Sequence, residues 1–244
     1  MAAITPGTLA DVAGDPALAE LYEAKAQTYA AFGNGAIAGH AERLLPPDGR
    51  VLDVGCASGG LLALLRSRGG HLAGLELSAS AATAAAQVAD QVVHGALEDP
   101  GLPFEPDSFD LVVLADVLEH LADPAAGLAR AVGWCRPGGA ILVSVPNIAH
   151  WQARLTLLRG RWPQEDSGTF DASHLRWFTC DALAALLAGA GLRDVELHAI
   201  VPALRNHAPA AAGPLARRLE PAWQALGRRV PQLLGYQVVG IGRR

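Results

Sequence analysis

Lysine is almost absent from this chain of 244 residues, in which Lys25 is the only one. The formal net charge is −5, from 24 acidic and 19 basic residues. A nucleic-acid-binding protein needs a concentrated basic face, and this composition does not supply one. Two arginine pairs, Arg217-Arg218 and Arg228-Arg229, occur late in the chain, and we expect them to solvate helices. The sequence therefore predicts no nucleic-acid partner.

Cysteine is scarce as well, and Cys56, Cys135 and Cys180 are scattered singly. This pattern argues against a disulfide framework or a thiolate zinc site, and it suits a reducing cytoplasm. No basic segment followed by an apolar core stands at the N-terminus, so we expect no signal peptide. The alanine-rich segments are too interrupted to cross a bilayer. We predict a cytoplasmic protein without stable membrane insertion.

One stretch, residues 51–62, reads as a buried strand, a glycine turn and the start of a helix. Its first residues form the apolar run of a strand that is covered on both faces, and Gly55 permits a sharp turn. Asp53 stands at the carboxyl end of this strand, where a carboxylate can accept hydrogen bonds from a cationic or hydroxylated ligand. Ala57 occupies the second glycine of the dinucleotide-binding fingerprint, so this pattern does not indicate a pyrophosphate site.

Further apolar runs follow, separated by helical segments. The predicted strands cover residues 50–54, 71–75, 91–95, 111–115, 140–145, 193–201 and 236–241. We expect Ser78 and Thr179 to cap helices, and residues 136–139 (Arg-Pro-Gly-Gly) to form a turn before the fifth strand. Strands that alternate with helices imply a parallel sheet with right-handed crossovers.

The run Asp-Val-Gly-Cys-Ala-Ser-Gly at residues 53–59 resembles the first motif of class I S-adenosylmethionine (SAM) methyltransferases. Arg-Pro-Gly-Gly before an apolar strand is another feature of that family, and the resemblance covers about residues 45–200. It implies an enzyme with SAM as cofactor. It also implies a Rossmann-like α/β fold with a doubly wound, seven-stranded, mostly parallel sheet whose last strand is antiparallel.

The resemblance also implies a set of cofactor-binding residues. Glu76 ends the second predicted strand, 23 positions beyond Asp53, and at this spacing its carboxylate can accept hydrogen bonds from both ribose hydroxyls. Ala96 stands where the family commonly has an acid, so Leu97 is expected to pack on the adenine while Glu98 or backbone groups contact its amino group. The other residues expected around SAM are Gly55, Cys56, Gly59, Leu77 and Ala115.

Asp116, Glu119 and His120 directly follow the fourth predicted strand. Spacing of i, i+3 and i+4 places the three side chains on one face of a helix, where they can hold a divalent cation. Oxygen-dominated ligation favours Mg²⁺ or Mn²⁺. The run is similar to the acid-x-x-Glu-His run of the polyprenyl-catechol O-methyltransferases of ubiquinone synthesis, which is implicated in metal binding. The alternative is a structural histidine, as in metal-free members.

His174 is a candidate fourth metal ligand or general base, with Asp171 to orient it. Glu119, His120 and His174 are therefore the predicted catalytic residues. The alternative is that His174 and Arg176 only hold a loop in place.

Residues 1–45 are expected to form a helical extension that covers the cofactor or packs on the sheet edge. Residues 46–244 are the predicted methyltransferase domain. Within it, residues 146–179 interrupt the alternation of strands and helices and contain three of the five tryptophans. We interpret this segment as a lid over the acceptor, and the alternative is a segment with a small core of its own.

The segments at residues 145–151 and 174–179 look like bacterial methyltransferases of glycan and cell-envelope synthesis, which favours O-methylation of a sugar or glycan hydroxyl. The alternative acceptor is an aromatic, polyprenyl-phenol or polyketide hydroxyl, and a non-catalytic SAM-binding module is a further alternative. A short-chain dehydrogenase is excluded because Lys25 has no tyrosine four residues before it. We expect a small-molecule or oligosaccharide acceptor and a monomer or homodimer.

Overall fold

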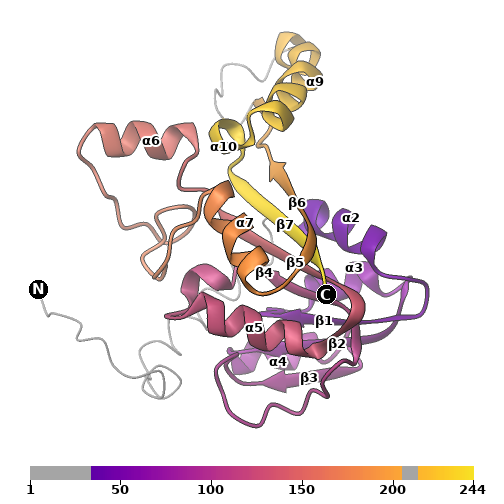
Figure 1. Cartoon of the computed structure of the whole chain (residues 1–244). Helices are drawn as coiled ribbons and strands as arrows, with labels where there is room; N and C mark the ends of the chain where they lie inside the picture. The colour runs from indigo at the N-terminus through magenta and orange to yellow at the C-terminus, as the bar shows by residue number, and fades with distance from the viewer. Residues whose placement is uncertain (1–33, 205–213) are drawn as a thin grey trace, which may run out of the picture. The chain divides into compact units, whose positions relative to one another are not determined.

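A computed structural model describes residues 34–204 and 214–244 (Figure 1). Most of the predicted N-terminal extension thus lies outside the described residues. The first part of the chain forms α2 (Asn34–Leu44), β1 (Gly49–Val54), α3 (Gly60–Leu65), β2 (Gly69–Glu76), α4 (Ala79–Ala85), β3 (Gln91–His94) and β4 (Phe109–Ala115). The next part forms a 3₁₀ turn (Leu118–His120), α5 (Pro124–Trp134), β5 (Cys135–Pro146), α6 (Trp151–Leu158) and α7 (Cys180–Gly189). The chain ends with β6 (Arg193–Ile200), α9 (Pro214–Arg229), α10 (Pro231–Leu234) and β7 (Gln237–Arg243).

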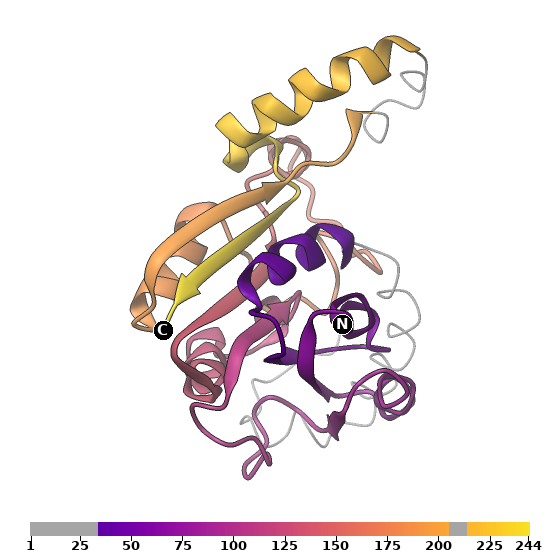
Figure 2. The same cartoon turned by 90° about the vertical axis from the view of Figure 1, so that its right-hand side faces the viewer.

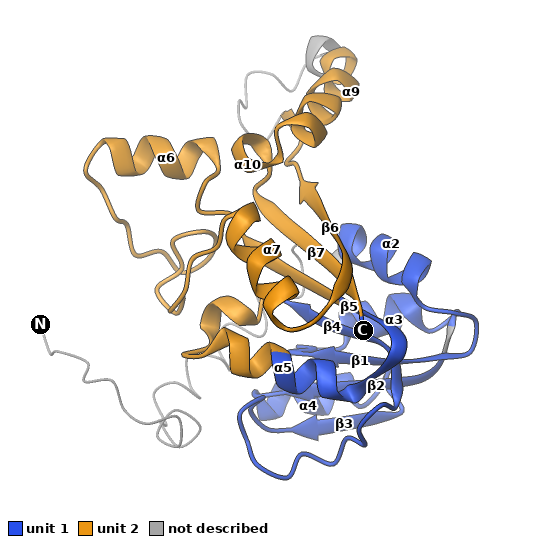
Figure 3. Cartoon of the chain, in the orientation of Figure 1, with its two compact units in different colours: residues 1–115, 129–141, 244 blue, residues 116–128, 142–243 orange. Residues whose placement is uncertain are grey.

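The strands form one seven-stranded sheet in the order β3-β2-β1-β4-β5-β7-β6. β1 pairs in parallel with β2 and β4, β2 pairs in parallel with β3, and β7 pairs antiparallel with β6. This confirms the predicted class: a mostly parallel α/β sheet with an antiparallel last strand. The described part of the chain divides into two compact units (Figure 3).

The first unit consists of residues 1–115, 129–141 and 244. β1 is its central strand, and Val51, Leu52 and Val54 are at most 1% exposed. Such an apolar run is stable only where both faces of the strand are covered, as the sequence predicted. In the β1–β2 pair Asp53 lies opposite Gly74, so the parallel register brings the carboxyl ends of both strands together.

The second unit consists of residues 116–128 and 142–243. Figure 2 shows its two long strands, β6 and β7, side by side. α7 packs on β7 at Gly240, where an added Cβ would meet Leu187 at 2.5 Å and Leu183 at 3.1 Å. Both leucines are fully buried, so this contact is part of the core of the unit.

The two predicted helix caps are confirmed. The Ser78 hydroxyl accepts from the Ala81 backbone N–H, and the Thr179 hydroxyl accepts from the Ala182 N–H. The predicted turn at residues 136–139 is wrong, because this stretch is the beginning of β5. The reason lies at the other end of the chain: Gly138 donates to the Arg244 carbonyl at 2.9 Å, and Arg244 donates to the Gly139 carbonyl at 3.1 Å. These two bonds to Arg244, the residue directly after β7, extend β5 through a sequence that favours a turn.

In the described part of the chain, no helix has the length and apolar character needed to cross a membrane.

Candidate functional site

The loop after β1 is folded tightly over the end of β2. Gly55 and Cys56 both donate backbone N–H groups to the Leu75 carbonyl, at 2.8 and 3.1 Å. Gly55, Ala57 and Gly59 have φ values of 72°, 46° and 82°, in the left-handed region that favours glycine. At Gly59 an added Cβ would meet Val88 at 2.5 Å, so this glycine serves close packing beside α4 as well as the turn.

Glu76 connects this loop to the start of α4. One carboxylate oxygen accepts from the Ala57 N–H at 2.8 Å, and the other accepts from the Ser78 N–H at 2.8 Å. The side chain is buried. Because each carboxylate oxygen has two lone pairs, Glu76 can still accept the hydroxyl groups of a ligand.

Asp53 is 3% exposed at the end of β1. Burial raises the pKa of its carboxyl to about 8, and the nearby Glu76 carboxylate contributes to this increase. The same burial and the same two carboxylates also raise the pKa of the Cys56 thiol. The loop therefore holds two neighbouring acids with too little positive charge around them. A cationic ligand would relieve this imbalance.

The remaining predicted SAM contacts lie on the loops after β2 and β3 and at the end of β4. The Leu77 carbonyl bonds to a His94 ring nitrogen at 3.0 Å, and Leu97 is 5% exposed. Asp99 is a further residue of this loop, not predicted from the sequence, and its carboxylate accepts from the Ala96 N–H at 2.8 Å. A turn of this kind has a sequence signal: an aspartate shortly after the end of a strand, whose side chain can accept a backbone N–H from three residues earlier. Half-buried Ala115 is the last residue of β4. Direct contact of all these residues with SAM stays a prediction.

Asp116 is not on the helical face that the spacing predicted. Leu118–His120 is a single 3₁₀ turn, and Asp116 precedes it with a φ of 55°. Its two carboxylate oxygens accept from the Gln237 side-chain amide at 2.7 and 2.8 Å, and the Ser144 hydroxyl donates to one of them at 3.3 Å. Burial raises the pKa of Asp116 to about 6, while these hydrogen bonds lower it. Asp116 is thus bound to β5 and β7 residues.

Glu119, His120 and His174 do come together. One ligand atom from each lies within 4.8 Å of those of the other two, and the two imidazole rings meet edge to face with centroids 4.8 Å apart. Glu119 is 1% exposed, and neither of its carboxylate oxygens has a hydrogen-bond partner among the described residues. Burial raises the pKa of the Glu119 carboxyl well above its usual range, and Asp116 and Asp171 raise it further.

Residues 171–176 are held against this turn by backbone bonds. Leu175 and Arg176 both donate to the Glu119 carbonyl, at 2.8 and 3.0 Å. Ser173, which the sequence analysis did not single out, contacts the His120 Nδ1 through its carbonyl and its hydroxyl, each at 3.3 Å. Asp171 in turn accepts from the Ser173 hydroxyl at 2.6 Å. Asp171 therefore connects through Ser173 to His120. Only the folded chain reveals this arrangement.

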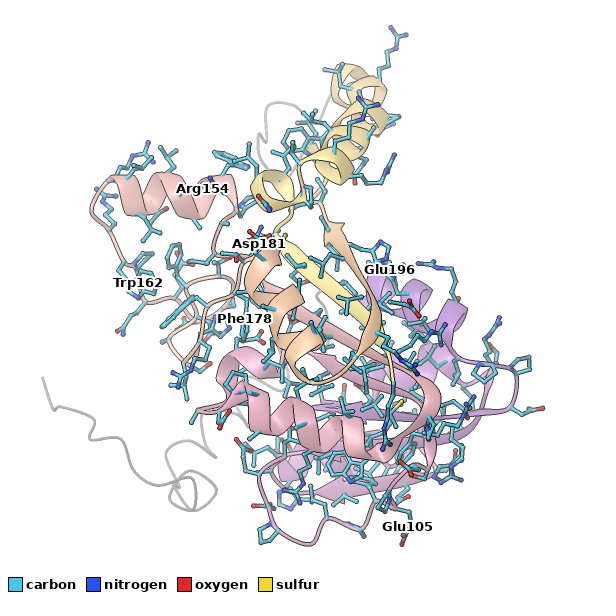
Figure 4. The ribbon with its side chains drawn as sticks, viewed as in Figure 1. Glu105, Arg154, Trp162, Phe178, Asp181 and Glu196 are labelled. Atoms are coloured by element: carbon cyan, nitrogen blue, oxygen red, sulfur yellow. The ribbon has the colours of Figure 1, made fainter. Side chains whose placement is uncertain are left out.

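The predicted lid segment, residues 146–179, contains α6 and an aromatic cluster. Arg154 on α6 and Trp162 in the following loop are labelled in Figure 4. The Trp162 ring meets Trp177 at 4.9 Å and Phe170 at 5.3 Å, both edge to face. Trp162 and Trp177 are 48% and 39% exposed. This cluster gives the segment a small apolar centre, and its function as a lid stays a proposal.

Comparison with known proteins identifies the fold and the family. The sequence profile of a family described as methyltransferase domain matches residues 29–197. The chain belongs to this family. The prediction of a class I SAM-dependent methyltransferase is thereby confirmed.

Curated relatives of this methyltransferase include two proteins named ubiquinone biosynthesis O-methyltransferase. The protein from Aromatoleum aromaticum is 30% identical over 158 residues, which are 61% of this chain and 65% of that protein. The protein from Burkholderia thailandensis is 30% identical over 165 residues, 63% of this chain and 68% of that one. The match thus spans about two thirds of each relative.

Solved structures share the fold at low sequence identity. A SAM-dependent methyltransferase from Thermotoga maritima, described as a possible histamine N-methyltransferase, has a TM-score of 0.63 at 19% identity, covering 92% of this chain and 98% of that one. An S-adenosylmethionine-dependent methyltransferase from Mesorhizobium loti has a TM-score of 0.57 at 21% identity, covering 87% and 100%. At such identities the likeness concerns the fold alone.

Proposed function

We propose that this methyltransferase transfers the methyl group of SAM to a hydroxyl of an aromatic acceptor, such as a polyprenyl-substituted phenol. The observation that carries the acceptor class is the name shared by the curated relatives, ubiquinone biosynthesis O-methyltransferase. The sugar or glycan acceptor, which the sequence analysis preferred, has no support from these relatives. Its alternative, a phenolic hydroxyl, is the better proposal.

The charge around Asp53 fits the positively charged amino-acid end of SAM. Asp53 and Glu76 are both buried, and the burial of Asp53, with a contribution from the Glu76 carboxylate, raises the Asp53 pKa to about 8. A bound ammonium group would favour the ionised Asp53. Glu76 is held by two backbone N–H groups in a fixed orientation, from which its remaining lone pairs can accept two ribose hydroxyls.

Glu119, His120 and His174 fit a divalent cation. A buried carboxylate without a hydrogen-bond donor is costly unless it is protonated or bound to a cation, and Glu119 is such a group within the described chain. With Asp116 bound elsewhere, the candidate ligands are one carboxylate and two imidazoles. This set suits Zn²⁺, Mn²⁺ or Fe²⁺, whereas Mg²⁺ prefers oxygen ligands, so the expected magnesium has no support. When bound, such a cation lowers the pKa of a coordinated hydroxyl.

The contacts around His120 orient its ring. The Ser173 carbonyl can only accept a hydrogen bond, so the His120 Nδ1 carries the proton in this contact. The Nε2 then keeps its lone pair, which can bind a cation or accept a proton from the acceptor. Residues 146–179 are the proposed lid that excludes water, within a methyltransferase domain of residues 46–244.

The proposal is tested by supplying SAM with phenolic acceptors that carry a polyprenyl chain, and with sugar acceptors as the comparison. We expect methyl transfer to the phenolic oxygen only. Transfer to the sugars alone would restore the rejected acceptor class. SAM binding without transfer to either class would favour the non-catalytic module.

The metal part is tested by binding as well as by activity. Chelator-treated protein should bind Mn²⁺ or Zn²⁺ in calorimetry, and Glu119→Gln should lose this binding while it still binds SAM. Glu105→Gln is the matched control, because Glu105 is an exposed glutamate that does not belong to the cluster of Glu119, His120 and His174. Full turnover in chelator, with no heat of metal binding, would leave His120 or His174 as a general base without a metal.

A further inference from the structure

α9 is strongly amphipathic. Leu219, Ala222 and Leu226 follow one another at spacings of three and four residues, which places them along one side of the helix. Leu219 and Leu226 are 48% and 49% exposed. The stripe continues past the helix end with Val230 and, on α10, Leu233, which are 37% and 40% exposed. The described part of the chain thus leaves an apolar stripe uncovered over both helices.

A different side of α9 is attached to its own unit. The Trp223 ring N–H donates to the Pro202 carbonyl at 2.9 Å, and the Gln224 amide donates to the Val201 carbonyl at 3.2 Å. Glu220 accepts from the Leu204 N–H at 2.9 Å. The apolar stripe is therefore not the face that fixes the helix to the end of β6. Figure 1 shows α9 and α10 together beyond the ends of β6 and β7.

Exposed arginines accompany the stripe. Arg218 and Arg229 are eleven residues apart, so they lie on one line along the helix, roughly 90° around the axis from the leucines. Arg217 and Arg228 form a second line on the opposite side of the helix. α9 and α10 together contain these four arginines against the single acid Glu220, although the whole chain has a net charge of −5. The positive charge of this unusually basic helix is thus divided: Arg218 and Arg229 lie beside the exposed apolar side chains, and Arg217 and Arg228 lie across the helix from them.

We propose that α9 and α10 dock this protein on the surface of an anionic lipid bilayer, with Leu219, Leu226 and Val230 entering the headgroup region. An amphipathic helix with leucines on one face and arginines beside them is the type that lies in a membrane interface without crossing it. A second copy of the chain is a poorer occupant, because symmetric pairing of these helices would bring like charges together. Nucleic acid would leave the apolar stripe unpaired.

The experiment measures co-sedimentation of the full chain with vesicles, without SAM or an acceptor. Vesicles of phosphatidylcholine alone are compared with vesicles that also contain phosphatidylglycerol. We expect binding only to the second kind, weakening with salt. Each arginine near the surface is worth roughly fivefold in partitioning, so Arg218→Glu with Arg229→Glu should weaken binding by at least about 25-fold.

Matched variants keep the test specific. Leu226→Asp should abolish binding, whereas Leu64→Asp should not, although Leu64 on α3 is also 49% exposed. Arg217→Glu with Arg228→Glu should weaken binding less than the Arg218 and Arg229 pair. Absence of binding to phosphatidylglycerol, equal binding to both vesicles, or equal effects of the two leucine variants would overturn the proposal. So would a dimer in light scattering that Leu226→Asp dissociates, because a second copy would then cover the stripe. None of these results depends on the proposed methyl transfer.

Discussion

Replacing Asp53 with asparagine should make the SAM-free protein more stable. The Asp53 carboxyl has a pKa of about 8 in the folded chain against 3.8 for an ordinary aspartate. A raised pKa means that the folded state resists ionisation, whereas in the unfolded state the carboxyl is half ionised at pH 3.8 and almost fully ionised by pH 5. At roughly 1.4 kcal/mol per pKa unit, this difference opposes folding at pH 7 by up to about 4 kcal/mol. Asparagine has nearly the same shape and removes this penalty.

The sign of the pH dependence follows from the same values. The penalty is absent below the unfolded pKa of 3.8, grows as pH rises, and is complete above the folded pKa of about 8. Urea denaturation of both proteins at pH 5 and pH 7 should therefore give a small advantage to Asp53→Asn at pH 5. The advantage should be larger by up to roughly 3 kcal/mol at pH 7.

A saturating concentration of SAM should reverse the order of stability. Its ammonium group compensates the ionised Asp53, so the natural protein gains more from the ligand than the variant does. Asp90→Asn is a control of opposite sign. Asp90 accepts from the Leu72 N–H at 2.7 Å and pairs with Arg66, which lowers its pKa, so this variant should lose stability at pH 7. An Asp53→Asn protein that is no more stable than the natural one at pH 7 would refute the reasoning.

Three further predictions concern the backbone of the two units. Ala57→Gly should raise the free energy of unfolding by about 1 kcal/mol, because φ is 46° at Ala57; an unchanged thermal midpoint would contradict this. Gly59→Ala should destabilise by about 1–3 kcal/mol through contact with Val88, and Val88→Ala in the same chain should recover part of the loss in denaturant titrations. Asn147→Ala should lower the free energy of unfolding by about 2–4 kcal/mol. The buried Asn147 amide donates to the Gln232 and Gly235 carbonyls, and its oxygen accepts from the Ala149 N–H. A loss below about 1 kcal/mol would show that water replaces these bonds.

The sheet and the glycine loop could be predicted because their signals are local. A buried parallel strand needs a mostly apolar run; β4 has one from Leu111 to Ala115, and β1 has one that only Asp53 interrupts. The Ser78 cap needs only a hydroxyl before a helical segment. The start of β5 could not be found in this way, because its backbone hydrogen bonds go to Arg244, which follows β7 and is more than one hundred residues away.

The candidate metal ligands were only half predictable. The sequence analysis proposed Glu119, His120 and His174 as members of one ligand set, and the structure places a ligand atom of each within 4.8 Å of the others, although His174 lies 54 positions beyond His120; metal binding itself stays a prediction. Asp116 was misplaced because helical spacing was assumed where the chain makes a left-handed turn and a 3₁₀ turn. The amide of Gln237 then binds the Asp116 carboxylate. No local sequence pattern indicates that Asp116 will bind Gln237, which lies 121 residues further along the chain.

The two hydrogen bonds that Glu76 accepts from Ala57 and Ser78 bear on how this chain can evolve. Loss of the carboxylate would leave two backbone donors without their acceptor, at a cost of roughly 1–3 kcal/mol each wherever water does not replace it. Selection for folding alone would therefore retain the acid, even in a descendant that no longer uses the cofactor. A glutamate at this position in an inactive paralogue would therefore indicate that the fold needs it, and would not indicate that the paralogue is still an enzyme.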